Sequence, residues 1–363
     1  SIFEGCSKLS DITLPEGLKE IGISAFEDCI NLTSIKIPEN VTKIRIHAFA
    51  NTGLTSISIP ANVNSIDDSV FGSCKNLAKV EISEGVKAIY KYSFVNCTSL
   101  TDITIPGSVE RTGYAAFEGC SSLKSVVLEE GVKYIDTASF FECTSLTDIT
   151  IPNSVTLINS EAFSGCSSLS EISIPESVMQ FGSSVFTDTP WLRKQQETDP
   201  YVTVNGVLID TSQCSGKEIT IPDKVSVIGF ASFSENKNLT EINIPDSVTQ
   251  IGRYAFENCD SLNKVNIGKG VTQICDLAFY QCNNLKSITI PGSVIKIGDY
   301  AFEKCESLET VNMETGVKEI GERVFYDCTN LKDIQLPESI IKIGEGAFNY
   351  TSWIEDQKQS NDF

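Results

Sequence analysis

Cysteine is the residue whose number and spacing could support the most chemistry in this chain. The 363 residues include 13 cysteines, and eleven of these follow a phenylalanine by three positions, in a Phe-x-x-Cys motif that recurs at a step of 23 residues. Thiols at regular spacing could form disulfides, act as nucleophiles or bind a metal. The Cys-x-x-Cys spacing typical of zinc sites is absent, so we predict no metal and no cofactor.

The regular cysteines are better explained by packing than by cross-links. Equivalent positions of neighbouring coils lie about 4.8 Å apart in a parallel stack, which is within disulfide range. The Cβ vectors of such a ladder run parallel instead of converging, so we predict free, buried thiols that behave as small hydrophobic side chains. Cys214 and Cys275 lie outside the column. Each could be a reactive thiol or an incidental substitution, and we favour the second interpretation.

Other catalytic groups are poorly placed. His47 is the one histidine, and the neighbouring repeats carry Ser24 and Ser69 at its position. A catalytic triad needs a base held between a nucleophile and an orienting carboxylate, so we interpret His47 as a surface residue. Two acidic residues could in principle catalyse hydrolysis. Acidic residues spaced along one face of a protein usually only keep that face in contact with water. Phosphate-binding and dinucleotide-binding motifs are absent. We predict no catalytic residue and no enzyme.

The elements that carry these residues follow from the repeat. In the segment from Phe140 to Phe163, Ile149-Thr150-Ile151 alternates as a short strand does, and Pro152 ends it. A second apolar pair, Val155 and Ile158, returns the chain on the opposite side. Fourteen such strands can be counted, from residues 12–14 to residues 334–336. The fold class we predict is therefore a mainly β repeat solenoid of about 15 coils with a parallel sheet, each coil packing on its neighbours.

The residue after the second apolar pair is most often glycine. We predict a left-handed backbone there, because Gly, Asp and Asn tolerate positive φ. The positions are Gly22, Asp67, Gly113, Asp136, Asn159, Gly182, Gly229, Gly252, Gly298, Gly321 and Gly344. Arg45, Tyr90 and Cys275 are the exceptions, and we expect strain at them.

Charge and hydropathy exclude some partners. The chain has 28 Lys and Arg against 48 Asp and Glu, a formal net charge of −20. Such a surface repels nucleic acid and anionic lipid, so we expect no nucleic acid partner. No apolar run is long enough for a transmembrane helix, so we expect no membrane insertion within this chain. The chain starts inside a repeat, at Ser1 to Cys6, and we expect it to be part of a longer protein.

The repeat pattern also resembles a known family. Leu-x-x-Ile-x-Ile-Pro-x-x-Val-x-x-Ile-Gly-x-x-Ala-Phe-x-x-Cys, as in Leu239 to Cys259, is similar to BspA-like leucine-rich repeats. The resemblance implies a right-handed curved solenoid with the Ile-x-Ile strands on its concave face. It also implies a secreted or cell-surface protein of a host-associated microbe that acts in adhesion. The family's motif contains no catalytic residue, so none is implied here.

The regular step breaks between Phe186 and Phe233. We divide one continuous solenoid into a first repeat block (1–186), an irregular insert (187–216), a second block (217–350) and a terminator segment (351–363). Within the insert, Thr189 and Pro190 favour the start of a short helix, and Asn205-Gly206 between apolar runs indicates a hairpin. The insert could contact a partner or join two repeat blocks, and we favour the second. Trp191 and Trp353 follow the two blocks at equivalent positions, so we interpret both as block terminators.

The candidate binding surface is the side of the strands that faces away from the core. Its first column is half acidic, and its second is mostly Thr, Ser and Asn. The candidate partner-binding residues are Asp102, Asp148, Glu171, Glu218 and Glu241. These columns have no aromatic residue, which disfavours a glycan and favours a protein, such as a host extracellular-matrix protein or another cell surface. Tyr92, Tyr254 and Tyr300, on the outer turn, offer a rival contact surface.

The function we predict is therefore non-enzymatic protein binding or adhesion at a cell surface or after secretion. A structural spacer that presents another domain is the alternative, and a glycan-binding module is the third hypothesis. The oligomeric state and the identity of the partner are not encoded in the motifs.

Overall fold

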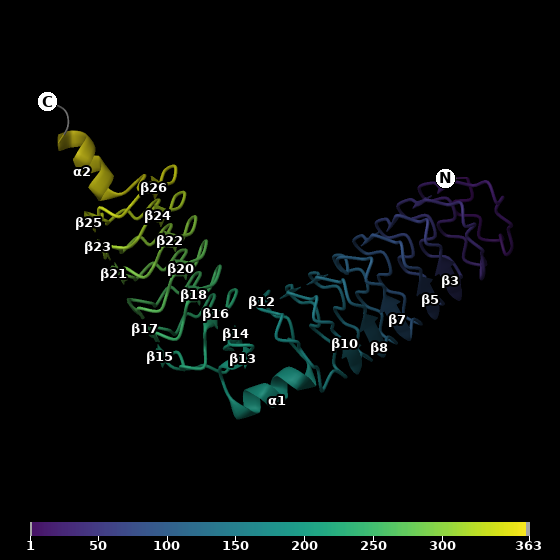
Figure 1. The fold of residues 1–363 in the computed structure, drawn as a ribbon, viewed down its shortest axis with the longest axis horizontal. Coiled ribbons are helices and arrows are strands. Elements are labelled where there is room, and N and C mark those ends of the chain that lie inside the picture. The colour runs from purple at the N-terminus through teal and green to yellow at the C-terminus, as the bar shows by residue number, and fades with distance from the viewer. Residues whose placement is uncertain (1, 361–363) are drawn as a thin grey trace. The chain divides into compact units, whose positions relative to one another are not determined.

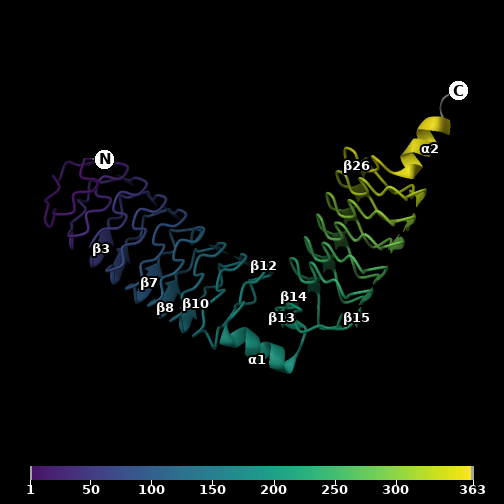
Figure 2. The same cartoon turned by 180° about the vertical axis from the view of Figure 1, so that it is seen from behind.

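Two parallel ladders of strands run through the repeats in the computed structural model, which describes residues 2–360. The chain forms two compact units, Ser1–Thr198 and Asp199–Phe363. Figures 1 and 2 show the strands of successive coils lying side by side within each unit. Alternating burial explains the longer strands: in β3 (Ser56–Ile59), Ile57 and Ile59 are buried and the two serines are exposed.

The longer strands are Ile-x-Ile segments of the sequence. Eleven of the fourteen predicted segments are strands within residues 2–360, and residues 12–14, 35–37 and 172–174 are not part of a sheet. In the first unit the longer strands are β3, β5 (Lys79–Ile82), β7 (Asp102–Ile105), β8 (Ser125–Leu128) and β10 (Asp148–Thr150). In the second they are β15 (Glu218–Thr220), β17 (Glu241–Ile244), β19 (Lys264–Ile267), β21 (Ser287–Ile290), β23 (Thr310–Met313) and β25 (Asp333–Gln335). They pair in the orders β3-β5, β7-β8-β10, β15-β17-β19 and β21-β23-β25. We call the exposed side of the Ile-x-Ile segments in each unit, whether or not a segment is part of a sheet, the long-strand face.

Shorter strands form the second ladder. In the first unit they are β1 (Glu20–Ile21), β2 (Lys43–Ile44), β4 (Ser65–Ile66), β6 (Ala88–Ile89), β9 (Tyr134–Ile135), β11 (Leu157–Ile158) and β12 (Gln180–Phe181). In the second they are β16 (Val227–Ile228), β18 (Gln250–Ile251), β20 (Gln273–Ile274), β22 (Lys296–Ile297), β24 (Glu319–Ile320) and β26 (Lys342–Ile343). The second unit begins with an antiparallel hairpin of β13 (Val202–Val204) and β14 (Val207–Asp210), whose second strand joins this sheet beside β16. Asn205 and Gly206 form its turn with φ of 51° and 79°.

A continuous column of phenylalanine rings fills the core of each unit. Neighbouring rings are stacked 5.2–5.7 Å apart in the first unit and 5.0–5.7 Å apart in the second. The helices α1 (Pro190–Thr198) and α2 (Ser352–Ser360) follow these columns. Trp191 lies 4.5 Å from Phe186, and Trp353 lies 5.2 Å from Phe348, measured between ring centroids. Each tryptophan therefore packs on the last ring of its column.

The cysteine column is buried and unpaired, as the spacing predicted. All 13 cysteines are free, and ten of them are buried. Each of these ten thiols donates a hydrogen bond of 3.0–3.2 Å to the carbonyl oxygen of the phenylalanine in the preceding coil. Burial raises the pKa of Cys120 to about 12. These thiols are packing groups, because neither thiolate chemistry nor cross-linking is favoured at such sites.

The prediction of a left-handed backbone at the glycine column is wrong for all but Gly113. Of the positions we named, that residue alone has positive φ in the described chain, and Arg45, Tyr90 and Cys275 do not have it either. Glycine is needed there for close approach: a Cβ at Gly252 would lie 2.5 Å from the carbonyl oxygen of Ile228 in the preceding coil. At Gly22, by contrast, a Cβ would meet no atom of the described residues within 4 Å.

The left-handed residues lie instead on either side of each phenylalanine. Ser24 and Asp28, two positions before and after Phe26, have φ of 51° and 61°. Their amides donate to Ile46 and Ala50 in the next coil, both at 3.0 Å. The turn around the phenylalanine, which we call the outer turn, therefore forms a third set of hydrogen bonds between coils.

Candidate functional site

The five acidic candidates all lie on the long-strand face, but they do not form one row. Asp102, Asp148, Glu218 and Glu241 are the first residues of β7, β10, β15 and β17. Asp102 and Asp148 both pair in register with Ser125 of β8, so one strand separates them. Glu218 pairs directly with Glu241. Glu171 is exposed on a segment outside the sheets. The first three candidates in the chain belong to the first unit and the last two to the second.

One of the five candidates, Glu241, has a lysine partner. Lys264 Nζ lies 2.8 Å from Glu241 Oε1, and this contact lowers the pKa of the Glu241 carboxyl. Asp102 accepts a 2.8 Å bond from the Thr101 hydroxyl, and Asp148 lies 3.5 Å from that of Ser125. Within residues 2–360, Asp102, Asp148 and Glu171 form no ion pair, whereas Glu241 does. Asp102, Asp148, Glu171 and Glu218 are therefore the candidates most available to a basic partner, and three of these four belong to the first unit.

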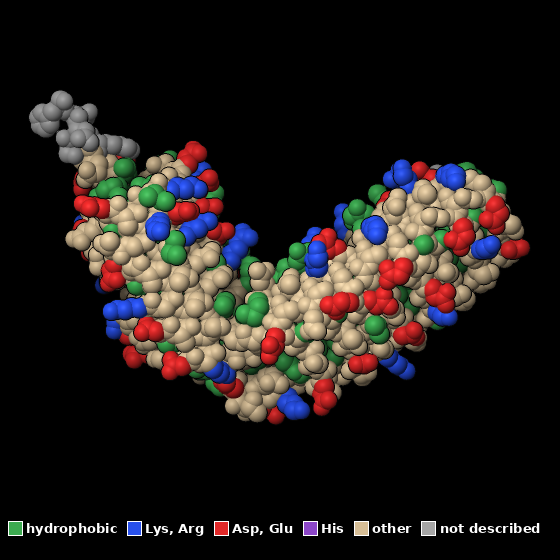
Figure 3. Space-filling view, in the orientation of Figure 1, with side chains coloured by type: hydrophobic (Ala, Val, Ile, Leu, Met, Phe, Trp, Pro, Cys, Tyr) green, Lys and Arg blue, Asp and Glu red, His purple; other side chains and the backbone are tan. Residues whose placement is uncertain are grey.

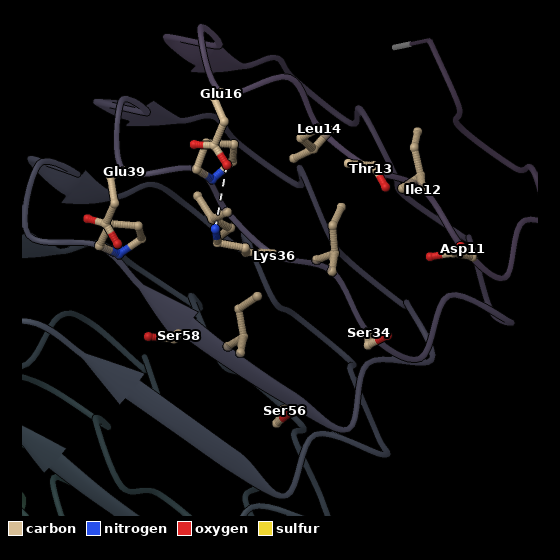
Figure 4. Close-up of a pocket in the computed structure, with 15 residues that line it drawn as sticks. Asp11, Ile12, Thr13, Leu14, Glu16, Ser34, Lys36, Glu39, Ser56 and Ser58 are labelled. Atoms are coloured by element: carbon tan, nitrogen blue, oxygen red, sulfur yellow. Dashed lines mark hydrogen bonds and ion pairs between the residues drawn. The ribbon is translucent and has the colours of Figure 1, made fainter.

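A hollow extends the same face toward the first coils. It has a volume of about 630 Å³ and lies over the Ile-x-Ile segments of the first two coils and the start of β3. Polar residues of the two exposed columns, among them Asp11, Ser34 and Ser56, line it together with isoleucine side chains. Lys36 approaches Glu16 to 3.5 Å, and both are highly exposed. Figure 4 shows these side chains, with the Lys36 to Glu16 contact dashed.

The sequence predicted the polar columns but not the hollow. The columns could be enumerated from the Ile-x-Ile pattern, whereas a depression depends on how successive coils stack in space. The acidic residues Asp11, Glu16 and Glu39 line it. Only a comparison of the exposed columns with the turn that follows each strand segment could have brought these three together from the sequence.

His47 does not form a catalytic arrangement. Its Nδ1 atom lies 3.3 Å from Glu27 Oε1, and its side chain is 44% exposed. A single carboxylate partner without a nucleophile in contact gives no triad. In the described part of the chain, no group of three or more His, Cys, Asp or Glu residues could hold a metal ion.

The two cysteines outside the column are not activated either. Cys214 donates to the carbonyl oxygen of Pro200, and burial raises its pKa to about 11. Cys275 lies 3.1 Å from Gln250 Nε2, and burial raises its pKa as well. A raised pKa leaves little thiolate at neutral pH, so neither residue has the environment of a reactive cysteine.

The outer-turn tyrosines lie at left-handed positions. Tyr92, Tyr254 and Tyr300 have φ of 59°, 59° and 60°. Tyr92 contacts Tyr114 edge to face in the first unit, with ring centroids 5.3 Å apart. The other two belong to the second unit, where further tyrosines occupy the neighbouring coils.

The sequence matches the BspA type leucine rich repeat region over residues 1–121, 87–199, 211–291 and 260–362. The chain belongs to the BspA-type leucine-rich repeat family. Its repeats, hydrogen-bonded cysteine column and parallel strands are those of a leucine-rich-repeat solenoid. No protein of curated function matches it. No helix among residues 2–360 is long and apolar enough to cross a membrane.

Several solved structures are similar to this BspA-type chain. A leucine rich cell surface protein from Faecalibacterium prausnitzii A2-165 is 32% identical, covers 81% of this chain and 83% of its own, and has a TM-score of 0.44. A leucine-rich repeat protein from Bacteroides ovatus ATCC 8483 is 27% identical over 99% of this chain and 77% of its own, with a TM-score of 0.35. The pneumococcal vaccine antigen PcpA is 19% identical over 95% and 82%, with a TM-score of 0.38.

Proposed function

We propose that this protein binds another protein through the long-strand face of its first unit, at a cell surface or after secretion. The observation that carries the proposal is the set of exposed carboxylates without an ion-pair partner, at Asp102, Asp148 and Glu171. The hollow over the first coils continues the same face and adds acidic side chains. A basic segment of a partner complements this surface and would be drawn to it by the net charge of −20.

We propose adhesion to host extracellular-matrix proteins as the form of this binding, because the resemblance to BspA-like repeats implies it. The Faecalibacterium relative is described as a cell surface protein, in keeping with the proposed location. Glu218 and Glu241 occupy the equivalent strand position in the second unit, but Lys264 forms an ion pair with Glu241 and neutralises its charge. We therefore assign Glu241 a smaller share of the binding energy. Acidic and basic side chains are interspersed on the face shown in Figure 3, so neither unit presents charges of a single sign on that face.

The test is surface plasmon resonance with immobilised fibronectin, laminin and collagen. We expect the double variant Asp148→Lys and Glu171→Lys to weaken binding at least about tenfold, which corresponds to about 1.4 kcal/mol. Glu161→Lys is the matched control, because Glu161 is exposed on the outer turn of the same block. Equal loss in the control would move the site off the long-strand face. Absence of binding to all three proteins would favour the spacer.

A further inference from the structure

One tyrosine per coil occupies the outer turn of five consecutive coils in the second unit. Tyr254 and Tyr300 stand two positions before their phenylalanines, Tyr280 and Tyr326 one position after, and Tyr350 two positions after. We call these five residues the tyrosine ridge. They are half of the ten tyrosines in the chain, and the proposed protein-binding face uses none of them.

Neighbouring aromatic rings and cationic side chains contact most of the ridge tyrosines and restrict their motion. Tyr254 contacts Phe230 edge to face at 5.4 Å, and Tyr326 contacts Tyr350 in the same way at 5.0 Å. The cations of Arg253, Lys304 and Arg323 lie 4.9, 5.8 and 5.0 Å from the ring centres of Tyr254, Tyr280 and Tyr326. Tyr350 is 62% exposed, and the other four remain partly exposed. Fixed, accessible rings lose little entropy when a ligand packs against them.

Three of the tyrosines occupy an unfavourable backbone. Tyr254, Tyr300 and Tyr350 have φ of 59°, 60° and 58°. A bulky residue in this region is an outlier, and glycine, asparagine and aspartate fill it at lower cost. Asn258 occupies the equivalent position two residues after its phenylalanine. Leu277 and Arg323 have the same backbone at the corresponding position of neighbouring coils, so the outer turn accepts large side chains without selecting for a ring.

Spacing and charge restrict what the ridge could bind. Phenylalanine rings of successive coils in this unit are 5.0–5.7 Å apart. Tyr254 and Tyr300 occupy the same position two coils apart, as do Tyr280 and Tyr326. In an extended pyranose chain, the length of one sugar is close to the spacing between two successive coils. Every second sugar would therefore lie beside a tyrosine of the same pair, either Tyr254 and Tyr300 or Tyr280 and Tyr326. The outer turn carries three carboxylates, at Glu257, Glu303 and Asp327, beside the three cations that contact the tyrosines. Because charges of both signs are present in equal number, a neutral polymer fits the ridge better than a polymer of one charge sign.

We propose that the tyrosine ridge binds a neutral polysaccharide in extended conformation, along the axis of the coil stack. The apolar faces of the sugar rings pack on tyrosine, as apolar groups do on aromatic rings. Partly exposed side chains on the same turns, Asn258, Gln281 and Asp327, supply hydrogen-bond donors and acceptors for the hydroxyls. This site is independent of the protein-binding surface proposed above, because its residues and its unit differ.

The experiment is isothermal titration of the full chain with neutral hexasaccharides, namely cellohexaose, xylohexaose and mannohexaose, and with polygalacturonate as the anionic comparison. We expect at least one neutral hexasaccharide to bind. Tyr300→Ala should weaken that binding about tenfold, whereas Tyr300→Phe, which keeps the ring, should change it less than about threefold. Tyr90→Ala is the control, since Tyr90 is 50% exposed in the first unit and lies outside the ridge.

Thermal unfolding of each variant separates lost binding from lost structure. An unchanged midpoint with weaker binding for Tyr300→Ala, and unchanged binding for Tyr90→Ala, supports the site. The proposal is overturned if no neutral hexasaccharide binds at millimolar concentration, if polygalacturonate binds more tightly, or if the control weakens binding equally. Loss of extracellular-matrix binding in Tyr300→Ala without any sugar binding would also overturn it and would assign the ridge to a protein partner.

Discussion

The hydroxyl oxygen of Thr189 accepts a 3.1 Å hydrogen bond from the amide of Leu192. Thr189 stands where most coils have cysteine, three residues after phenylalanine, and it caps α1. Thr351 occupies the same position before α2 and accepts from Ile354 at 3.2 Å. A threonine at this position, followed by tryptophan two residues later, therefore accompanies the change from coil to helix in both units.

Replacing the cap should weaken the end of the first unit. We expect Thr189→Ala to lower the free energy of unfolding by about 1 kcal/mol, because the Leu192 amide loses its acceptor. Thr189→Ser keeps the hydroxyl and should stay close to wild type. Urea unfolding followed by circular dichroism measures both variants. Equal stability of the two would show that the hydroxyl does not contribute.

Close approach at the glycine column predicts a large difference between equivalent positions. Gly252→Ala would bring a Cβ within 2.5 Å of the Ile228 carbonyl oxygen, so we expect a loss of about 2 to 3 kcal/mol from overpacking. Gly22→Ala meets no atom within 4 Å and should be nearly neutral. Neither residue has positive φ, which makes the pair a clean comparison. Similar melting temperatures for both variants would contradict the packing explanation.

Glu118 should make stability depend on pH. Burial raises the pKa of its carboxyl, and the neighbouring carboxylates of Glu142 and Glu161 raise it further. A carboxyl with a raised pKa in the folded state stabilises the fold below the unfolded pKa, and this contribution is lost as pH rises through the folded value. Glu118→Gln should therefore increase stability at neutral pH, by less than about 1 kcal/mol because the group is partly exposed.

The gain from Glu118→Gln should disappear below the ordinary glutamate value of 4.5, where the carboxyl is protonated in both states. Denaturant midpoints across this range measure the effect. Glu39→Gln, at an exposed position in an earlier coil, serves as the control. A gain that persists at acid pH would point to packing instead of charge.

The buried cysteine column predicts selective thiol reactivity. Under native conditions we expect a maleimide to label at most Cys6, Cys214 and Cys275, which are exposed or half-buried, and to spare the ten buried cysteines. In urea all 13 should react. Intact-mass spectrometry without reduction counts the labels. Fewer than 13 labels in urea would reveal disulfides and contradict the free-thiol structure.

The period of the sequence was enough to predict the solenoid, because burial alternates along most Ile-x-Ile segments and proline ends most of them. Asn205-Gly206 identified the hairpin for an equally local reason, since both residues accept positive φ. The glycine column was misinterpreted because glycine serves two needs. It permits positive φ and it permits close approach, and only the neighbouring coil shows which need applies at Gly252.

The candidate site was less predictable than the fold. The first column of acidic residues could be followed from strand to strand, and Asp102 and Asp148 do lie on one exposed face. Glu171 and Glu218 seemed to continue that row, but they belong to different units. The compensation of Glu241 by Lys264 follows from register between β17 and β19. These relationships depend on spatial arrangement, which the columns alone do not give.

The coil between Phe49 and Phe71 is one residue shorter than the others, yet their rings remain stacked at 5.6 Å with an interplanar angle of 2°. Gly53 absorbs the missing residue, because a side chain there would overlap the carbonyl of Ile30 in the preceding coil. In this coil the connecting turn therefore tolerates the loss of one residue while the ring column is kept. Genes for such arrays can lose codons in the connecting turn without losing register, so repeats can diverge in length as well as in sequence.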